Sequence, residues 1–134
     1  MIAVLLPLLA QTAAAPEMKI DCENAMTQQD MNICAHQEFQ QADTALNAQW
    51  SVTAAHMRER DANLADYADD GRPGYFETLL AAQRAWLLFR DTHCKVEGYL
   101  ARGGSMEPML VSGCKTTLTT ARAQQLRELS EYPY

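Results

Sequence analysis

Four cysteines are the feature that most restricts how this chain of 134 residues can fold. Their positions are Cys22, Cys34, Cys94 and Cys114. None of them forms the close Cys-x-x-Cys pair that is typical of structural zinc sites, so we expect disulfides made in an oxidising compartment rather than a metal site or free thiols. Four cysteines allow three pairings. We favour Cys22–Cys34 with Cys94–Cys114, although the sequence alone does not decide the pairing.

Residues 1–15 have the form of a signal peptide. An uncharged apolar run of about ten residues, too short to span a bilayer, is followed by the small residues Ala13-Ala14-Ala15. The Lys or Arg that usually precedes such a run is missing. The alternative is a buried N-terminal helix, but Pro7 and Pro16 argue against it. The context of Cys22 is not a lipid-attachment motif, so we expect a periplasmic or secreted product that begins near Pro16.

The rest of the chain, residues 16–134, is expected to form a single domain. It carries a net charge of −6 and no second apolar segment long enough to cross a membrane. Nucleic-acid binding needs a basic surface, so this charge argues against a nucleic-acid partner. It suits a protein partner that is itself basic. The sequence does not give the oligomeric state.

The first predicted helix begins at Thr27-Gln-Gln-Asp30, which has the form of a capping box. Its helical periodicity weakens after Asp61 and ends at Gly71-Arg-Pro-Gly74, which breaks a helix. Whether residues 61–70 are helix or loop stays open. The apolar residues that recur at helical spacing are Met31, Cys34, Ala35, Phe39, Ala42, Leu46, Trp50 and Met57.

Two further helices are predicted. The second spans Tyr75–Leu100, with an apolar stripe of Phe76, Leu79, Leu80, Trp86, Leu87, Cys94 and Leu100. Ser105 is expected to cap the third, which has Glu107 and Pro108 in its first turn. Its stripe is Met109, Leu110, Cys114, Leu118, Ala121, Leu126 and Leu129. No segment alternates with the period of a strand. The predicted fold is therefore all-α, a small antiparallel three-helix domain cross-linked by two disulfides.

Four polar residues fall on or beside the apolar stripes: Asp43, Asn47, Gln83 and Arg90. Polar groups carried into a core need partners, because an unpaired buried charge costs several kcal/mol. We predict a structural network in which Asp43 pairs with Arg90, while Asn47 and Gln83 complete the hydrogen bonds.

The sequence offers no recognisable catalytic motif. The three histidines, His36, His56 and His93, are scattered, and no serine stands in a nucleophile-elbow context. The cysteines are expected to be oxidised and thus unavailable as nucleophiles. We therefore predict no catalytic residues, no metal and no cofactor.

The stretch from Glu59 to Asp70 is acidic. Its aspartates are Asp61, Asp66, Asp69 and Asp70, and Arg60 is its one basic residue. One interpretation is an ordinary solvated face, and the other is a contact surface for a basic partner. Because irregular exposed connections often carry binding residues, the candidate contact segments are Asp61–Tyr75 and the turn from Arg102 to Ser105.

In combination, these residues resemble the LprI-type lysozyme-inhibitor family, a group of bacterial exported domains. The resemblance covers residues 22–129. It lies in Cys22-x11-Cys34, Ala42-Asp43-x-x-Leu46-Asn47, Ala82-Gln-Arg-Ala-Trp-Leu-Leu-Phe-Arg-Asp91-x-x-Cys94, Gly103-Gly-Ser105, and Cys114 followed by Leu118-Thr-x-x-Arg122-x-x-x-Leu126.

The resemblance implies a protein that binds and blocks lysozyme without chemistry of its own. C-type lysozymes are strongly basic, so an acidic inhibitor would associate faster at low salt. No family motif marks a residue that contacts lysozyme, and none is transferred to this sequence. The alternative is a periplasmic interaction, envelope-maintenance or immunity module with another protein partner. An enzyme acting on the cell wall is a third possibility, without support from any motif.

Overall fold

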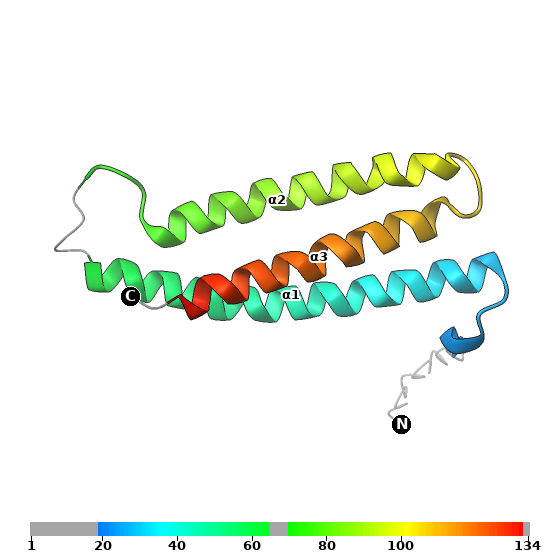
Figure 1. The fold of residues 1–134 in the computed structure, drawn as a ribbon, viewed down its shortest axis with the longest axis horizontal. Helices are drawn as coiled ribbons and strands as arrows, with labels where there is room; N and C mark the ends of the chain where they lie inside the picture. Colours follow the sequence, from blue (N-terminus) through cyan, green and yellow to red (C-terminus); the bar gives the residue numbers. More distant parts are fainter. Residues whose placement is uncertain (1–18, 65–69, 133–134) are drawn as a thin grey trace, which may run out of the picture.

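The structure, a computed structural model, describes residues 19–64 and 70–132. In these residues it is entirely helical and contains no strand. Three long helices, α1 (Gln28–Leu64), α2 (Tyr75–Gly98) and α3 (Glu107–Glu131), run antiparallel in sequence order (Figure 1). Two short 3-10 helices, η1 (Cys22–Asn24) and η2 (Tyr99–Ala101), precede α1 and follow α2. The predicted three-helix fold is confirmed. The expected signal peptide lies outside the described residues.

Helix α1 begins as its sequence predicts. The Oγ1 atom of Thr27 accepts a hydrogen bond of 3.1 Å from the backbone N–H of Asp30, one of the donors that a helix start leaves unsatisfied. At the other end α1 continues to Leu64, so the first four residues of the 61–70 segment are helical. Residues 65–69 lie outside the described part of the chain, so whether they are helix or loop stays open.

The connection from α2 to α3 differs from the prediction at Ser105. Met106, not Ser105, occupies the N-cap position of α3, and no side chain caps this helix. The carboxylate of Glu107, one residue inside α3, instead accepts a 2.7 Å hydrogen bond from the N–H of Gly103, whose φ of +76° favours glycine. The turn is therefore closed by an acid within the helix. Pro108 lies in the first turn of α3, as expected.

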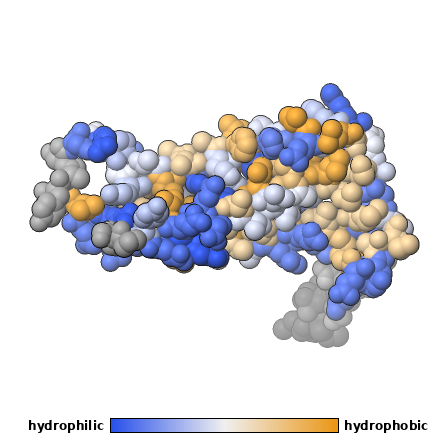
Figure 2. Space-filling view, viewed as in Figure 1, coloured by the Kyte–Doolittle hydropathy of each residue, from blue (hydrophilic) through white to orange (hydrophobic). Residues whose placement is uncertain are grey.

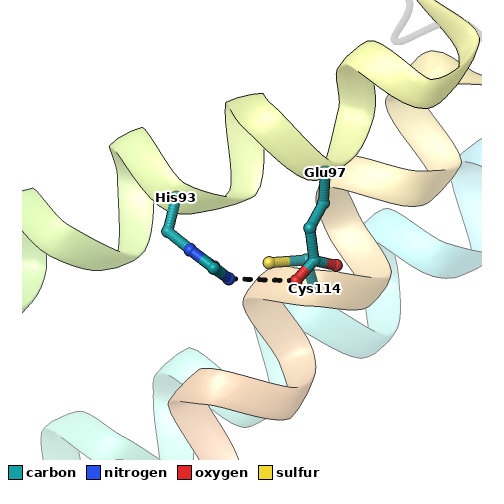
Figure 3. Close-up of side chains that lie close together, drawn as sticks. All are labelled: His93, Glu97 and Cys114. Carbon is teal, nitrogen blue, oxygen red and sulfur yellow. Dashed lines mark hydrogen bonds and ion pairs between the residues drawn. The ribbon is translucent and has the colours of Figure 1, made fainter.

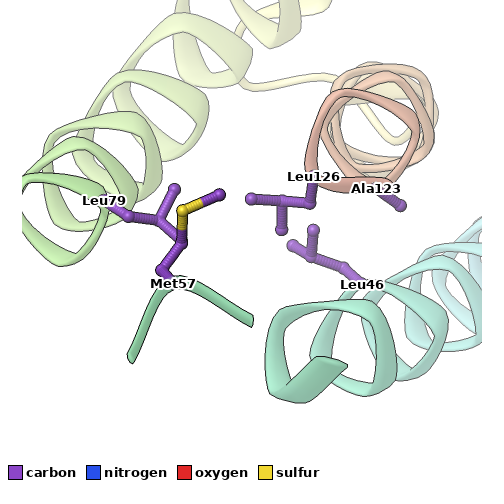
Figure 4. Packing of buried hydrophobic residues seen from close by; sticks show 5 residues of the cluster. All are labelled: Leu46, Met57, Leu79, Ala123 and Leu126. Carbon is purple, nitrogen blue, oxygen red and sulfur yellow. The ribbon is translucent and has the colours of Figure 1, made fainter. Parts of the chain in front are cut away.

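The hydrophobic core draws on all three helices. Figure 4 shows the buried side chains of Leu46, Met57, Leu79 and Leu126 converging on a common centre, and Ala123 of the same cluster lies beside Leu126 on α3. The rings of Trp50, Phe76 and Trp86 pack against this cluster from its edges. Helix α3 packs along both α1 and α2, while α1 and α2 contact each other less extensively. The core thus lies mainly where α3 meets the other two helices.

Four residues assigned to the apolar stripes are exposed instead: Leu87, Leu100, Ala121 and Leu129. For α2 the reason is that apolar residues occupy two faces. One face enters the core through Leu79, and the other lies outward with Leu88, Phe89 and Val96 exposed by 51–68%. The exposed apolar surface continues into η2 with Tyr99 and Leu100. Two fully buried threonines, Thr53 and Thr119, were not among the predicted core residues. Thr53 is accommodated because its hydroxyl donates a 2.8 Å hydrogen bond to the carbonyl of Leu126.

Both disulfides form as favoured, Cys22–Cys34 and Cys94–Cys114. The first ties η1 to the N-terminal part of α1, and the second joins α2 to α3 shortly before and after their connecting turn. In the chain-entropy picture each bridge stabilises the fold by roughly 3 kcal/mol, because it restricts the unfolded chain. In the described residues no helix is both long and apolar enough to cross a membrane.

Candidate functional site

The two segments proposed as partner contacts lie at opposite ends of the bundle. In Figure 1 the α1–α2 connection is at the left, and the α2–α3 turn is at the right, beside the start of α1. Helix α2 separates them with 24 residues, a length of about 36 Å at 1.5 Å per residue. The structure therefore does not bring the two segments together into one surface.

At the α1–α2 end, Asp61 has a structural partner. Its carboxylate, in the last turn of α1, accepts hydrogen bonds from the backbone N–H groups of Tyr75 (2.6 Å) and Phe76 (3.0 Å). These are the first residues of α2, whose N-cap, Gly74, has no side chain to satisfy them. A Cβ at Gly74 would lie 2.7 Å from Asp61 Oδ1, so glycine is required for the carboxylate to approach. Asp61 is thus the cap of a neighbouring helix.

The other aspartates of the α1–α2 connection are either paired or outside the described residues. Asp70 forms an ion pair with Arg72 and accepts a 3.0 Å hydrogen bond from the Arg72 backbone. The Arg72 side-chain hydrogen bond, followed by the backbone one, lowers the pKa of Asp70. Asp66 and Asp69 lie within residues 65–69, which the structure does not describe. The two described aspartates of this connection are therefore already engaged within the molecule.

The α2–α3 turn is joined to the start of α1. The side-chain amide of Asn32 donates a 2.8 Å hydrogen bond to the carbonyl of Ser105. Arg102 lies over the ring of Tyr99, with its guanidinium carbon 4.6 Å from the ring centroid. We call this part of the molecule the turn end. It comprises η1, the first turns of α1, η2 and residues 102–106.

The turn end and the adjoining part of α1 include a long stretch of chain that has acids but no Lys or Arg. Between residues 20 and 57 the chain has no Lys or Arg, and its acids are Asp21, Glu23, Asp30, Glu38 and Asp43. Asp43 pairs with Arg90, and the others have no salt bridge among the described residues. Asp21 keeps its charge to lower pH than usual, since hydrogen bonds from the Asn24 side chain and the Glu23 backbone lower its pKa. The lack of Lys and Arg over residues 20–57 is visible in the sequence, although the predicted acidic contact surface was the run at 59–70.

Exposed apolar side chains lie at the same end. Met26 is 87% exposed, Leu100 86% and Met106 40%. Figure 2 shows hydrophobic residues gathered on the surface in the upper right, where Figure 1 places the C-terminal half of α2. Exposed apolar surface of this kind is typical of contact sites for other proteins. This exposed apolar surface was not predicted, because the helical spacing of Leu100 places it on the apolar stripe expected to face the core.

The polar network is a structural feature of the interior. Arg90 is only 6% exposed, and its guanidinium lies 3.0 Å from a carboxylate oxygen of Asp43 and 3.0 Å from one of Asp91. It also donates to the hydroxyl of the buried Thr119. Asn47 donates to Asp43 over 3.4 Å. The side chain of Asp43 remains 37% exposed, so the cation of this pair is buried and the anion lies at the edge.

Gln83 has a different partner from the predicted one. Its carbonyl oxygen accepts a 2.9 Å hydrogen bond from Nε of Arg122 on α3, and it does not bond to the Asp43–Arg90 pair. The ring of Trp86 is near both arginines, with its centroid 5.2 Å from the guanidinium carbon of Arg90 and 6.0 Å from that of Arg122. The buried polar residues therefore form two neighbouring groups, one around each guanidinium.

One cluster has the residue types of a metal site. His93 Nε2, a carboxylate oxygen of Glu97 and Sγ of Cys114 lie within 4.8 Å of one another (Figure 3). The sulfur of Cys114 is bonded to Cys94, however, and a disulfide sulfur is not the thiolate that metals bind. That leaves His93 and Glu97, which hydrogen-bond to each other over 3.1 Å. Two ligands fall short of the three that a catalytic zinc site supplies.

These features define a class: a small helical bundle, cross-linked by disulfides, with an acidic and apolar end exposed. Residues 21–126 match the family described as lysozyme inhibitor LprI, and the chain belongs to that family. The match covers all three helices almost completely, so the family resemblance noted in the sequence is confirmed.

The chain is also similar to an uncharacterized protein of Rhizobium meliloti (strain 1021). The two are 46% identical over 119 residues, which cover 89% of this chain and 85% of the relative. No solved structure matches. Family membership and the disulfides are consistent with an exported protein.

Proposed function

We propose that this protein binds lysozyme and blocks it through a stoichiometric protein–protein contact, with no catalysis of its own. The proposal includes export to the periplasm or the exterior of a bacterial cell. The observation that carries it is the match of residues 21–126, nearly the whole helical domain, to the lysozyme-inhibitor family. The turn end, one of the two ends of the bundle, has features that would suit such a contact.

The turn end is the proposed contact surface. Its apolar side chains, Met26, Leu100 and Met106, would supply the centre of an interface. Glu23 and Glu38, with the other acids of residues 20–57, would supply a charged rim. An apolar centre with a polar rim is the usual anatomy of a protein–protein interface. The rim has the sign that attracts a basic c-type lysozyme.

This surface includes one of the two segments proposed from sequence, the turn with Arg102 and Ser105. The other segment is less suited to a charged contact, since Asp61 caps α2 and Asp70 pairs with Arg72. Both disulfides lie in the half of the bundle that carries the turn end. They hold this surface in one conformation before binding, which reduces the entropy lost on association.

The test is a lysis assay on bacterial cell walls with c-type lysozyme and increasing amounts of the oxidised protein. We expect saturating inhibition near a one-to-one ratio, weaker at moderate salt than at low salt. The double variant Glu23→Lys/Glu38→Lys should inhibit at least about tenfold less well at low salt, because it reverses two rim charges.

The matched control is Glu128→Lys/Glu131→Lys, which changes the net charge equally but lies at the far end of α3. It should inhibit like the wild type. If both double variants lose inhibition equally, only net charge matters and the turn end is not the contact. If the oxidised wild type inhibits no class of lysozyme, the inhibitor proposal is wrong. An envelope or immunity module with another partner would then be the better description.

A further inference from the structure

A cavity lies at the end of the bundle opposite the turn end. It measures about 860 Å³ and opens between the last turns of α1, the first turns of α2 and the end of α3. Its apolar walls include Met57, Leu64, Leu79 and Leu129. Cavities of roughly 300–1,000 Å³ are the size that holds small organic ligands.

Among the described residues that line this cavity, cations outnumber acids. They are three arginines, Arg60, Arg72 and Arg122, against two acids, Asp61 and Asp70. Both acids are engaged, Asp61 by the backbone of α2 and Asp70 by Arg72. A cationic cavity is unexpected in a chain of net charge −6. It indicates an anionic ligand rather than a cation or a neutral one.

Arg122 is the cation best placed to bind that anion. Its Nε donates to the amide oxygen of Gln83 over 2.9 Å, and its Nη1 donates to that of Gln125 over 3.0 Å. Among the described residues no carboxylate forms a salt bridge with it, in contrast to Arg90, which has two. Burial lowers the pKa of Arg122, although a guanidinium keeps its charge at neutral pH. A partly buried charge held by neutral partners is available to an incoming anion.

We propose that this cavity binds an amphiphilic carboxylate, such as a medium-chain fatty acid. The carboxylate pairs with the guanidinium of Arg122, which suits bidentate recognition of a planar anion. The alkyl chain lies against Met57, Leu64, Leu79 and Leu129. The combination of an apolar wall with a cation requires both parts in one ligand, since a small anion would leave the wall uncovered and an alcohol would leave the charge unpaired. This site is independent of the proposed contact with lysozyme.

The test is calorimetric titration of the oxidised protein with dodecanoate below its micelle concentration. Dodecanol, with the same chain and no charge, and acetate, with the same head and no chain, serve as comparison probes. We expect dodecanoate to bind one-to-one and dodecanol to bind at least about tenfold more weakly, because a charge-assisted hydrogen bond is lost. Acetate should give no binding at millimolar concentration. Equal binding of dodecanoate and dodecanol, or no dodecanoate binding, would overturn the proposal.

Two variants test the site by separate routes. Arg122→Gln removes the cation and should weaken dodecanoate binding at least about tenfold while leaving dodecanol binding nearly unchanged. Ala82→Phe adds a ring to a residue that lines the cavity and is exposed, so it should block both ligands without disturbing the core. Arg127→Gln, an exposed arginine of α3 that does not line the cavity, is the control and should bind as the wild type does. Unchanged dodecanoate binding in Ala82→Phe would place the ligand elsewhere.

Discussion

Arg90 has a buried guanidinium whose positive charge is balanced by the groups around it. Two carboxylates and one hydroxyl accept its hydrogen bonds. Its guanidinium carbon lies 5.1 Å from the ring centroid of Phe39 and 5.2 Å from that of Trp86. An arginine with planar donors and stacked rings is suited to such a position, whereas a lysine would present one point charge. This residue therefore links all three helices, since Asp43 lies on α1, Asp91 on α2 and Thr119 on α3.

The two carboxylates should be partly interchangeable. Asp43→Asn alone is expected to cost about 1 kcal/mol of unfolding free energy, because Arg90 retains Asp91. Asp91→Asn should cost a similar amount. The double variant leaves the buried cation without a carboxylate and should cost about 3 kcal/mol or more, beyond the sum of the two. Denaturant unfolding of the four proteins measures this coupling. Strictly additive losses would show that neither acid substitutes for the other as a partner of Arg90.

At this scale the sequence identified the right residues but not every partner. The spacing of Asp43 and Arg90 on apolar stripes was enough to pair them, because buried charges have few alternatives. The predicted partner of Gln83 was the Asp43–Arg90 pair, whereas its hydrogen bond is with Arg122. A stripe shows which face of its own helix a residue occupies, but it does not show which residue of the next helix lies at the same height. That height depends on the turns and on close approaches, such as that of Gly98 to Val111, where a Cβ would lie 2.5 Å from Cγ2.

Among the helices, α2 begins in an unusual way, since its cap comes from another helix. Gly74 has an ordinary φ of −68°, which does not require glycine. A glycine suits this position because it leaves room for the Asp61 carboxylate. Asp61→Ala should cost about 1 kcal/mol, the usual loss for an N-cap acceptor, and should loosen the packing of α2 on the end of α1.

The close approach of the Asp61 carboxylate to Gly74 gives a second prediction for α2. In the wild type, Gly74→Ala should destabilise the fold by about 1–2 kcal/mol, because the new methyl group displaces the carboxylate. In the Asp61→Ala background the same substitution should cost clearly less, since the group it displaces is gone. Thermal unfolding of the four variants provides the comparison. An equal cost of Gly74→Ala in both backgrounds would contradict the capping role of Asp61.

The elements themselves were largely predictable, and their connections were not. The capping box at Thr27 and the glycines and proline of residues 71–74 fix helix boundaries through local chemistry. The role of Asp61 depends on a contact between residues 14 positions apart in different helices. The expected cap at Ser105 was wrong for a similar reason. Glu107 closes the turn instead, and the Ser105 carbonyl accepts from Asn32 on α1.

In the whole molecule, the antiparallel topology divides the surface into two distinct ends. Successive connections of such a bundle lie at opposite ends, so the 61–75 and 102–105 segments could not share one partner surface. The turn end is acidic, exposes apolar side chains and is held by disulfides. The far end contains the cavity with Arg60, Arg72 and Arg122. From Ala82, which lines the cavity, to Gly98, where α2 ends at the turn end, the helix rises about 24 Å, and this rise separates the two proposed binding sites.

This separation predicts that the two activities are independent. Sites this far apart with no shared partners usually behave additively. Arg122→Gln and Ala82→Phe should therefore inhibit lysozyme within about twofold of the wild type, while Glu23→Lys/Glu38→Lys should bind dodecanoate within about twofold. Lysis assays and calorimetry on the same protein preparations measure both. If the cavity variants lose lysozyme inhibition while remaining folded, the contact with lysozyme lies at the α1–α2 end. The acidic connection at 61–75 would then be the better candidate.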